Sequence, residues 1–313
     1  MILNSNKLYG IRIKFKWYLV QERATVISRL KKWSVTDASY RINYIKGEDE
    51  IMNKAVFFDI DGTLIDCLNG ITDITPRVKK TIRALQANGD YVFIATGRPY
   101  AFLNETLRNF GFDGFVLTNG AYVNVKDKCI YKESINKEIV KELAYNFEEL
   151  NLEYILQGEK YSYIKDEYKK LHSFYDSYSI PKKYLEGNYN LEEVDIYKIE
   201  MLCNDKKGMD YCLSLGNGNF DYVHNLEVGS FELYSKTNSK ASGILKVLDC
   251  LDIPLENSYA FGDGKNDIEM LSTVGCGIAM GNADDYVKSY AKKVTDTVQN
   301  DGVALEIEKF ILI

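Results

Sequence analysis

The stretch AVFFDIDGT, residues 55–63, decides the fold of this chain. Its first four residues are apolar, which is typical of a strand buried on both faces of a sheet. The apolar run ends at Asp59 and Asp61, two carboxylates two residues apart. In a low-dielectric pocket such carboxylates repel each other and require a cation or a shared proton. Gly62 permits the tight turn that follows. An isolated Asp-x-Asp is more often a solvated turn, so the rest of the chain must decide between structure and chemistry.

Strands and helices alternate on the C-terminal side of this stretch. The joints between them are short, which is typical of a parallel sheet with helices on both faces. The sequence therefore predicts an α/β fold with a doubly wound core, whose functional side chains gather at the carboxyl ends of its strands. In order, the pattern predicts a helix at residues 77–88, a strand at 91–95, a helix at 100–109 and a strand at 115–117.

Residues 121–235 have a different pattern. Short segments in which apolar and polar residues alternate are typical of antiparallel strands, and they are interleaved with helical stretches at 137–150 and 206–215. Tyrosines crowd this region, which suits sheet faces partly exposed to water. The strand–helix alternation then returns. We therefore expect a core made of residues 52–120 and 236–313, interrupted by an inserted α+β domain at 121–235.

Residues 1–51 differ from the rest of the chain. They contain ten Lys or Arg residues against five Asp or Glu. No apolar segment of the kind found in signal peptides follows these charges. Met52 directly precedes the first core strand, and Lys46-Gly47-Glu48 matches the translation of a purine-rich ribosome-binding site. We therefore expect translation to start at Met52, so that the leader is not translated. The alternative is an arm that binds a membrane surface or nucleic acid.

The composition excludes several classes of protein. The chain of 313 residues is 46% apolar and 27% charged, which is typical of a globular protein with room for two domains. A net charge of -6 argues against a general polyanion binder. The six cysteines form no C-x-x-C pair, and His172 and His224 are too few for a histidine-rich metal site. We expect a cytoplasmic protein that binds neither nucleic acid nor a membrane; the oligomeric state stays open.

Polar side chains that suit phosphate chemistry lie where the predicted core elements begin or end. Most have an ordinary explanation: Thr96 could cap a helix, and Asp267 in a first helical turn is favoured by the helix dipole. Lys240 is harder to explain, because a cation at a helix start opposes that dipole. Their joint occurrence predicts one site. Its candidate members are Asp59, Asp61, Thr96, Lys240, Asp263, Asn266 and Asp267.

These residue types together suit phosphoryl transfer. Asp59, Asp61 and Asp263 offer the hard oxygen ligands that Mg²⁺ prefers, and the ion keeps room for water and a substrate oxygen. One lysine and one hydroxyl can hold the other phosphoryl oxygens. An aspartate is then free to attack phosphorus, and a second one can protonate the leaving oxygen and later deprotonate water. A cation beside the nucleophile offsets its repulsion from an anionic ester.

The same motifs, in the same order, resemble the haloacid dehalogenase superfamily. Its four motifs match Asp59-Ile60-Asp61-Gly62-Thr63, Thr96-Gly97-Arg98, Lys240 and the segment GDGKND at 262–267. The closing segment GIAMGNA at 277–283 is similar to the Cof-type phosphatase branch. The resemblance covers about residues 52–313. It implies a Rossmann-like core, and the long insertion between Thr96 and Lys240 is similar to the type-two cap of subclass IIB.

The resemblance also implies a role for each matching residue. Asp59 would be the nucleophile and Asp61 the general acid and base, with Asp267 as a supporting carboxylate. The phosphoryl group would be contacted by Thr96, Gly97, Lys240 and Asn266. The Mg²⁺ ion would be held by Asp59, by the backbone carbonyl of Asp61, and by Asp263. The implied activity is Mg²⁺-dependent hydrolysis of small phosphomonoesters, either sugar phosphates or phosphorylated cofactors, through an aspartyl-phosphate.

Competing functions differ in how well the residues fit them. A P-loop is disfavoured, since Tyr259 stands where its first glycine belongs and Asn266 replaces its Ser or Thr. A dinucleotide-binding fold is disfavoured because no G-x-G-x-x-G follows a strand. A sugar phosphomutase of the same fold and a non-catalytic protein that binds a phosphate ligand remain open. Substrate specificity is expected to lie in the inserted domain, because the core groups contact only the phosphate.

Overall fold

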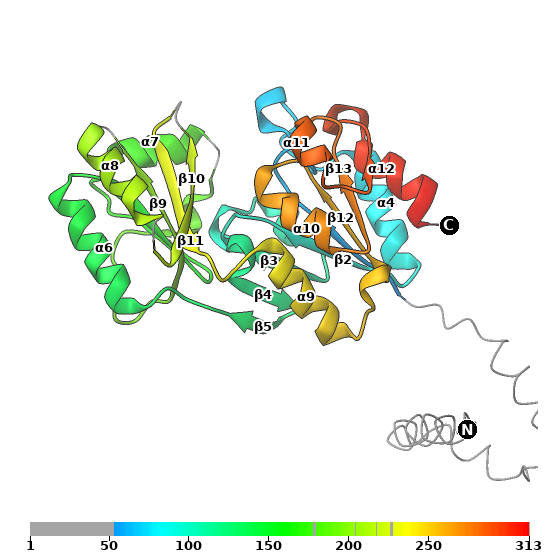
Figure 1. The fold of residues 1–313 in the computed structure, drawn as a ribbon, viewed down its shortest axis with the longest axis horizontal. Coiled ribbons are helices and arrows are strands. Elements are labelled where there is room, and N and C mark those ends of the chain that lie inside the picture. The colour runs from blue at the N-terminus through cyan, green and yellow to red at the C-terminus, as the bar shows by residue number, and fades with distance from the viewer. Residues whose placement is uncertain (1–52, 178–179, 204, 217, 226–227, 313) are drawn as a thin grey trace, which may run out of the picture. The chain divides into compact units, whose positions relative to one another are not determined.

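The described part of the chain forms two sheets with their own helices (Figure 1). The predicted leader, residues 1–51, and the predicted start at Met52 lie outside it. In this computed structural model the described residues are 53–177, 180–203, 205–216, 218–225 and 228–312.

The larger sheet has eight strands in the order β14-β13-β12-β1-β2-β3-β4-β5. The pairs from β14 to β3 are parallel, whereas β3–β4 and β4–β5 are antiparallel. β1 lies between β12 and β2, and all four of its side chains are buried. The strands are β1 (Ala55–Phe58), β2 (Tyr91–Ala95), β3 (Gly114–Leu117), β4 (Tyr122–Val125), β5 (Lys128–Lys132), β12 (Ser258–Gly262), β13 (Cys276–Ala279) and β14 (Lys293–Val294).

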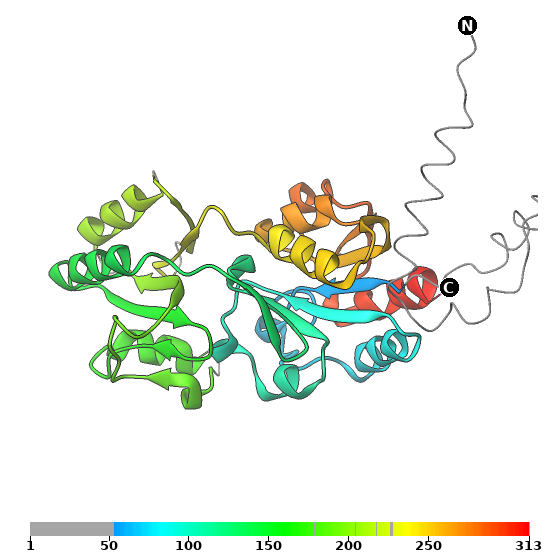
Figure 2. The same cartoon turned by 90° about the horizontal axis from the view of Figure 1, so that it is seen from below.

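Helices cover both faces of the larger sheet (Figure 2). Val56 and Phe58 of β1 pack in one apolar cluster with α4, α5 and α12. Ala55 and Phe57 pack in the other with α9, α10 and α11. The predicted α/β class with a doubly wound parallel core is therefore confirmed. The helices are α4 (Pro76–Ala87), α5 (Glu105–Asn109), α9 (Lys240–Leu251), α10 (Ile268–Thr273), α11 (Asp285–Lys288) and α12 (Gly302–Glu306).

The smaller sheet has six strands in the order β10-β11-β9-β6-β7-β8. Its pairs are antiparallel except for β7–β8. Two helices, α6 and α8, pack on one face of it, and α7 packs on the other. The elements are β6 (Glu153–Gly158), β7 (Ser162–Tyr163), β8 (Leu185–Glu186), β9 (Ile196–Leu202), β10 (Phe220–Asn225), β11 (Ser230–Ser235), α6 (Lys137–Glu149), α7 (Lys169–Ser177) and α8 (Lys206–Leu215).

The strands β4 and β5 belong to the larger sheet, although the sequence places their residues after the boundary at 121. Their alternating pattern predicts antiparallel pairing, and β4 does pair with β5; its other partner, however, is β3. The domain division itself stays a prediction. We propose that the inserted domain runs over residues 135–235, and we call this segment the insert.

The two chain segments that connect the insert to the core lie side by side. The Thr237 hydroxyl donates to Glu133 Oε1 (2.8 Å), and the Tyr131 hydroxyl donates to Asn238 Oδ1 (3.2 Å). Tyr131 also bonds to Glu133. These hydrogen bonds tie the outgoing segment to the returning one at a single place on the core.

The predicted helix at 100–109 is interrupted. A short turn at Tyr100–Phe102 is followed by Leu103 in an extended conformation, and Asn104 then caps α5 by accepting from the Leu107 N–H (2.8 Å). The Asn side chain competes for backbone groups and so starts a new helix. The other short helical turns are Cys67–Asn69, Thr118–Gly120, Lys182–Tyr184, Leu255–Asn257, Lys265–Asp267, Val298–Asn300 and Ile307–Ile311.

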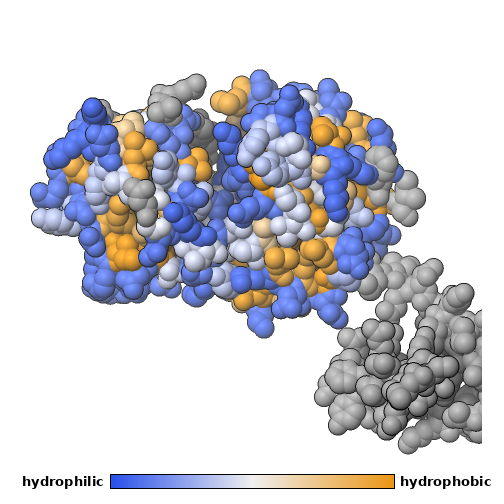
Figure 3. Space-filling model, viewed as in Figure 1, coloured by the Kyte–Doolittle hydropathy of each residue, from blue (hydrophilic) through white to orange (hydrophobic). Residues whose placement is uncertain are grey.

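On the face of the molecule shown in Figure 3, hydrophobic residues lie in separate patches among hydrophilic ones. Scattered exposed apolar residues of this kind are ordinary for a folded protein. A search of the described helices finds none whose length and apolar content would let it cross a bilayer.

Candidate active site

β1 places two aspartates at the carboxyl edge of the larger sheet. Asp59 directly follows the strand, and its backbone N–H donates to the carbonyl of Phe261 in β12 (3.0 Å). The Asp59 side chain is buried, whereas that of Asp61 is 56% exposed. Two neighbouring carboxylates therefore have different surroundings, which suits different chemical roles.

Lys240 reaches Asp59 from the first turn of α9. Ser239 and Ser242 cap this helix reciprocally: the Ser242 N–H donates to the Ser239 hydroxyl (3.2 Å), and the Ser239 N–H donates to the Ser242 hydroxyl (3.0 Å). Lys240 Nζ lies 2.5 Å from Asp59 Oδ1 and 2.6 Å from Asp267 Oδ1, and the residue is 1% exposed. Burial lowers the pKa of Lys240, but the two carboxylates outweigh it and the net shift is upward. Lys240 is thus an ammonium group shared by two buried carboxylates.

The loop after β12 supplies two further carboxylates. Asp267 is fully buried, and its Oδ2 accepts from the backbone N–H groups of Asp263 (2.9 Å) and Gly264 (2.8 Å). Asp263 Oδ1 accepts from the hydroxyl of Thr63 (3.1 Å). One carboxylate oxygen from each of Asp59, Asp263 and Asp267 lies within 4.8 Å of the others. With Lys240, predicted residues from three separate segments therefore meet in one place.

This cluster holds more negative charge than one lysine offsets. Burial raises the pKa of Asp59 well above its usual value; Lys240 opposes the shift, while Asp267 and Asp263 add to it. Burial, with Asp267 next, raises the pKa of Asp263 to about 7. Clustered carboxylate oxygens of this kind are the donors that hard divalent cations prefer, and a cation would relieve their repulsion. The residues present therefore fit a divalent metal ion.

The side chain of Asp61 is held by Arg98. Arg98 Nε donates to Asp61 Oδ2 (2.7 Å) and Arg98 Nη2 donates to Asp61 Oδ1 (2.6 Å), while Nη1 donates to the carbonyl of Phe102 (3.0 Å). Such paired hydrogen bonds fix the plane of a carboxylate. Arg98 belongs to the Thr96-Gly97-Arg98 motif, but no function is predicted for it from the sequence. An arginine two residues beyond a predicted phosphate-binding threonine is the signal that could have found it.

The other predicted phosphate-binding residues lie in the loops after β2 and β12. Thr96 directly follows β2, is 1% exposed, and its hydroxyl accepts from the Arg98 N–H (3.2 Å). Gly97 packs closely on Asn119, since a Cβ at Gly97 would lie 3.0 Å from Asn119 Oδ1. That amide oxygen is buried and has no partner within the described residues. Asn266 is exposed. Their contacts with a phosphoryl group stay predictions.

Asn282 is a second residue that sequence reasoning leaves without a role. It follows β13, and its Nδ2 donates to the carbonyl of Gly62 (2.8 Å) and to Asp263 Oδ2 (3.4 Å). Its Oδ1 accepts from the Val298 N–H (3.3 Å). Asn282 therefore joins the Asp59 loop to the Asp263 loop. Its place after the carboxyl end of a core strand is the signal that points to it.

We expect Gly62→Ala to disturb the cluster more than a matched glycine substitution does. Gly62 has φ +76°, and a Cβ there would lie 2.1 Å from Asp263 Oδ2; Gly70 has φ +82° and nothing within 4 Å of its Cβ position. Gly70→Ala should cost about 1 kcal/mol of unfolding free energy from backbone strain alone. Gly62→Ala should cost roughly 2–4 kcal/mol, because Asp263 must also move. Urea unfolding of both variants measures the difference, and equal losses would contradict the prediction.

Comparisons with known proteins identify the family of this chain. The sequence profile of haloacid dehalogenase-like hydrolases matches residues 56–307. YkrA of Bacillus subtilis (strain 168), named as a candidate phosphatase, is 32% identical over 267 residues, which are 83% of this chain and 99% of YkrA. YcsE of the same strain, named a 5-amino-6-(5-phospho-D-ribitylamino)uracil phosphatase, is 29% identical over 273 residues, or 84% of this chain and 98% of YcsE.

One solved structure is similar to this chain in both fold and sequence. The subclass IIB sugar phosphatase BT4131 superposes with a TM-score of 0.69 at 29% sequence identity, covering 83% of this chain and all of that one. The profile match and the relatives converge on one family and one branch of it. The chain belongs to the haloacid dehalogenase-like hydrolases and is a Cof-type, subclass IIB phosphatase.

Proposed function

We propose that this phosphatase hydrolyses phosphomonoesters of small metabolites through an aspartyl-phosphate formed on Asp59, with Mg²⁺ as its metal. The observation that carries the proposal is the position of Lys240, whose Nζ lies 2.5 Å from Asp59 Oδ1 and 2.6 Å from Asp267 Oδ1. Asp263 belongs to the same carboxylate cluster. A buried nucleophile beside a fixed cation is the arrangement that attack on an anionic ester requires.

The proposed reaction has two steps. In the first, an Asp59 carboxylate oxygen bonds to phosphorus while the bond from phosphorus to the leaving oxygen breaks, and Asp61 gives that oxygen a proton. In the second, Asp61 takes a proton from water, the water oxygen bonds to phosphorus, and phosphate leaves Asp59. Each oxygen of Asp61 accepts one hydrogen bond from Arg98 and keeps a second lone pair, on which the transferred proton can be carried.

Lys240 and the loops around it would position the phosphoryl group. Lys240 lowers the cost of bringing an anionic ester to Asp59, because its charge offsets the negative charge of the cluster. Thr96, Gly97 and Asn266 would contact the phosphoryl oxygens. Mg²⁺ would be held by Asp59 and Asp263, with the carbonyl of Asp61, and it would supply further charge stabilisation when bound.

The substrate class follows from the relatives under the same proposal. YcsE is named for a phosphorylated ribitylamino-uracil, and BT4131 for sugar phosphates. Both kinds of ester carry a leaving group rich in hydroxyls. We therefore place the substrate of this chain among sugar phosphates and phosphorylated cofactors.

Removing divalent metal should abolish turnover and restoring Mg²⁺ should recover it. We expect phosphate release from p-nitrophenyl phosphate to fall to background in EDTA, since the carboxylate cluster then lacks its cation. Mg²⁺ should also raise the thermal midpoint in the absence of substrate, because a cation relieves repulsion among the buried carboxylates. Turnover that persists in EDTA would contradict the proposed metal dependence. Phosphate release that requires a sugar bisphosphate activator would indicate a mutase.

A further inference from the structure

The smaller sheet has one apolar face and one mixed face, on which polar residues lie beside Ile155 and Leu202. The apolar face packs under α6 and α8 through residues such as Leu156, Ile199 and Leu233. Because successive side chains alternate, the intervening residues of β6, β9 and β11 point to the other face. Pairing aligns Gln157 with Lys198 and Tyr234, and Ile155 with Glu200 and Glu232. We call the polar members the cap-face cluster: Gln157, Lys198, Glu200, Glu232 and Tyr234.

Burial of this cluster is costly for folding. Gln157, Lys198 and Glu200 are 0%, 3% and 5% exposed. Glu200 also lies directly opposite Glu232 on the neighbouring strand, and like charges in that position are destabilising. Burial and then Glu232 raise the pKa of Glu200 to about 7. A sheet that served only to fold would place apolar residues here, as it does on its other face.

The hydrogen-bonding capacity of the cluster is unbalanced. Lys198 forms an ion pair with Glu232, and Glu200 accepts from the Tyr175 hydroxyl (2.6 Å) and from Gln157 Nε2 (3.4 Å). Gln157 Oε1 is buried without a partner within the described residues. The Glu232 side chain is still 34% exposed. Two carboxylates and a free amide oxygen are therefore served by few donors, so the cluster lacks hydrogen-bond donors rather than acceptors.

The cap-face cluster adjoins the loop that carries the predicted phosphate-binding residues. Lys198 Nζ donates to the carbonyl of Gly97 (2.9 Å), the residue directly after Thr96. A second contact joins the segment after β2 to the insert. The ring centroids of Phe102, in that segment, and of Tyr175, in α7, lie 4.9 Å apart. A molecule whose phosphate is held at Thr96 would therefore extend its other end toward this cluster.

We propose that Glu232 and Gln157 determine specificity by accepting hydrogen bonds from the leaving group, and that they select a neutral leaving group rich in hydroxyls. This inference rests on the proposed function. Two glutamates against one lysine disfavour a leaving group that carries a carboxylate or a second phosphate. Lys198 acts as a positioning residue that holds Glu232 near the Gly97 carbonyl.

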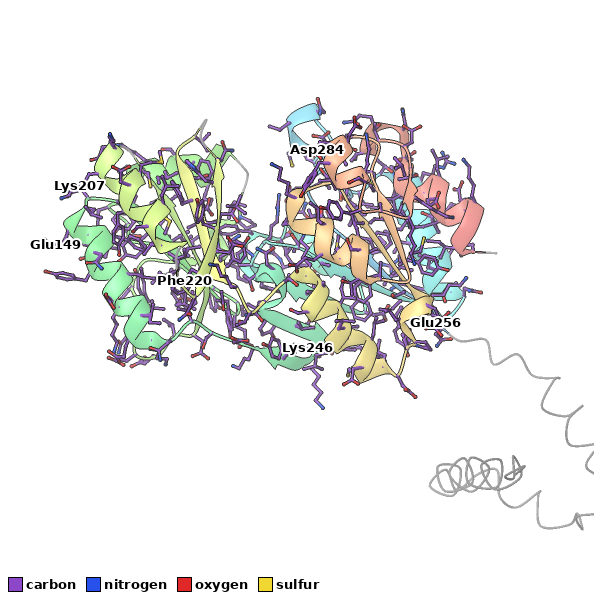
Figure 4. All side chains as sticks on the ribbon, in the orientation of Figure 1. Glu149, Lys207, Phe220, Lys246, Glu256 and Asp284 are labelled. Carbon is purple, nitrogen blue, oxygen red and sulfur yellow. The ribbon has the colours of Figure 1, made fainter. Side chains whose placement is uncertain are left out.

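The test compares Glu232→Gln and Gln157→Leu with the parent enzyme. Substrates are ribitol 5-phosphate and glucose 6-phosphate as hydroxyl-rich esters, 3-phosphoglycerate as a charged one, and p-nitrophenyl phosphate, which has no hydroxyls to bind. Glu149→Gln is the matched control: it removes an exposed charge from α6, on the far side of the sheet (Figure 4). Gln157→Leu removes an unpaired amide oxygen and one long hydrogen bond to Glu200 (3.4 Å), while the Tyr175 hydroxyl still donates to Glu200, so it should keep the fold.

We expect the parent enzyme to prefer a hydroxyl-rich ester over 3-phosphoglycerate. Glu232→Gln and Gln157→Leu should each lower kcat/KM for that ester by roughly 10–100-fold, because the first replaces a charged acceptor by a weaker neutral one and the second removes the amide acceptor. Their kcat/KM for p-nitrophenyl phosphate should change by less than about 3-fold. Glu149→Gln should change neither.

Three results would overturn the inference. Equal losses on p-nitrophenyl phosphate and the hydroxyl-rich ester would show a purely structural role, and unchanged kinetics on every ester would show that the two residues do not contact the leaving group. A parent enzyme that prefers 3-phosphoglycerate would show the wrong substrate class. Failure of the parent enzyme to release phosphate from any ester with Mg²⁺ present would instead reject the proposed function, so the two failures are distinguishable.

Discussion

Asp59→Asn is expected to lower turnover of p-nitrophenyl phosphate by roughly 10³-fold or more, because an amide cannot form the proposed phosphoryl bond. The substitution keeps the shape of a side chain that is buried against Lys240. Phosphate release under saturating Mg²⁺ measures the effect. Parent enzyme trapped with beryllium fluoride should carry the adduct on Asp59, and an adduct on another residue would contradict the assignment.

The same variant should be as stable as the parent, or more stable, when metal is absent. Asp59 carries a buried charge beside Asp263 and Asp267, and its removal relieves repulsion. Thermal unfolding in EDTA therefore separates lost chemistry from lost folding. An inactive variant whose midpoint falls sharply would leave no support for a catalytic Asp59, because unfolding alone would then explain the lost activity.

Lys240→Met is expected to cost roughly 3–5 kcal/mol of unfolding free energy, because it leaves two buried carboxylates without their cation. Lys240 Nζ lies 2.5 Å from Asp59 Oδ1 and 2.6 Å from Asp267 Oδ1, and Asp267 is fully buried. Urea unfolding in EDTA measures the loss. Mg²⁺ should recover part of it, since the ion supplies positive charge to the same carboxylates, whereas turnover should stay low with the metal present.

Lys246→Met is the matched control for this prediction. Lys246 lies on the same helix, is labelled in Figure 4, and its Nζ lies 3.9 Å from the centroid of the Tyr131 ring. Losing this cation–π contact should cost less than about 1 kcal/mol. Equal destabilisation by the two substitutions would contradict the special role of Lys240.

The core could be predicted from sequence because its signals are local. The apolar run at β1, the Thr-Pro start of α4 and the serine before α9 each fix one element through neighbouring residues. Since parallel strands align their carboxyl ends, Asp59 and Asp263 had to come close once those strands were assigned. Lys240 followed from its unusual position at a helix start.

Tertiary contacts decided what the sequence left open. The alternating pattern of β4 predicts an antiparallel partner, but it does not say which sheet the strand joins, and β3 is the partner. Arg98 and Asp61 are 37 residues apart, so only the folded loops bring their side chains together. The alternation in β9 marks two faces, yet the pattern alone does not tell which polar residues, such as Lys198, end up buried.

The paired connections of the insert have a consequence for how this enzyme can diversify. Because the Thr237 hydroxyl donates a hydrogen bond to Glu133, the proposed insert leaves and rejoins the core at one place. A segment with neighbouring termini can be exchanged as a module without changing the order of the core elements, such as β1, which precedes Asp59, and α9, which carries Lys240. A change of substrate would then require a change in the insert alone, while the residues proposed to carry out phosphoryl transfer stay the same.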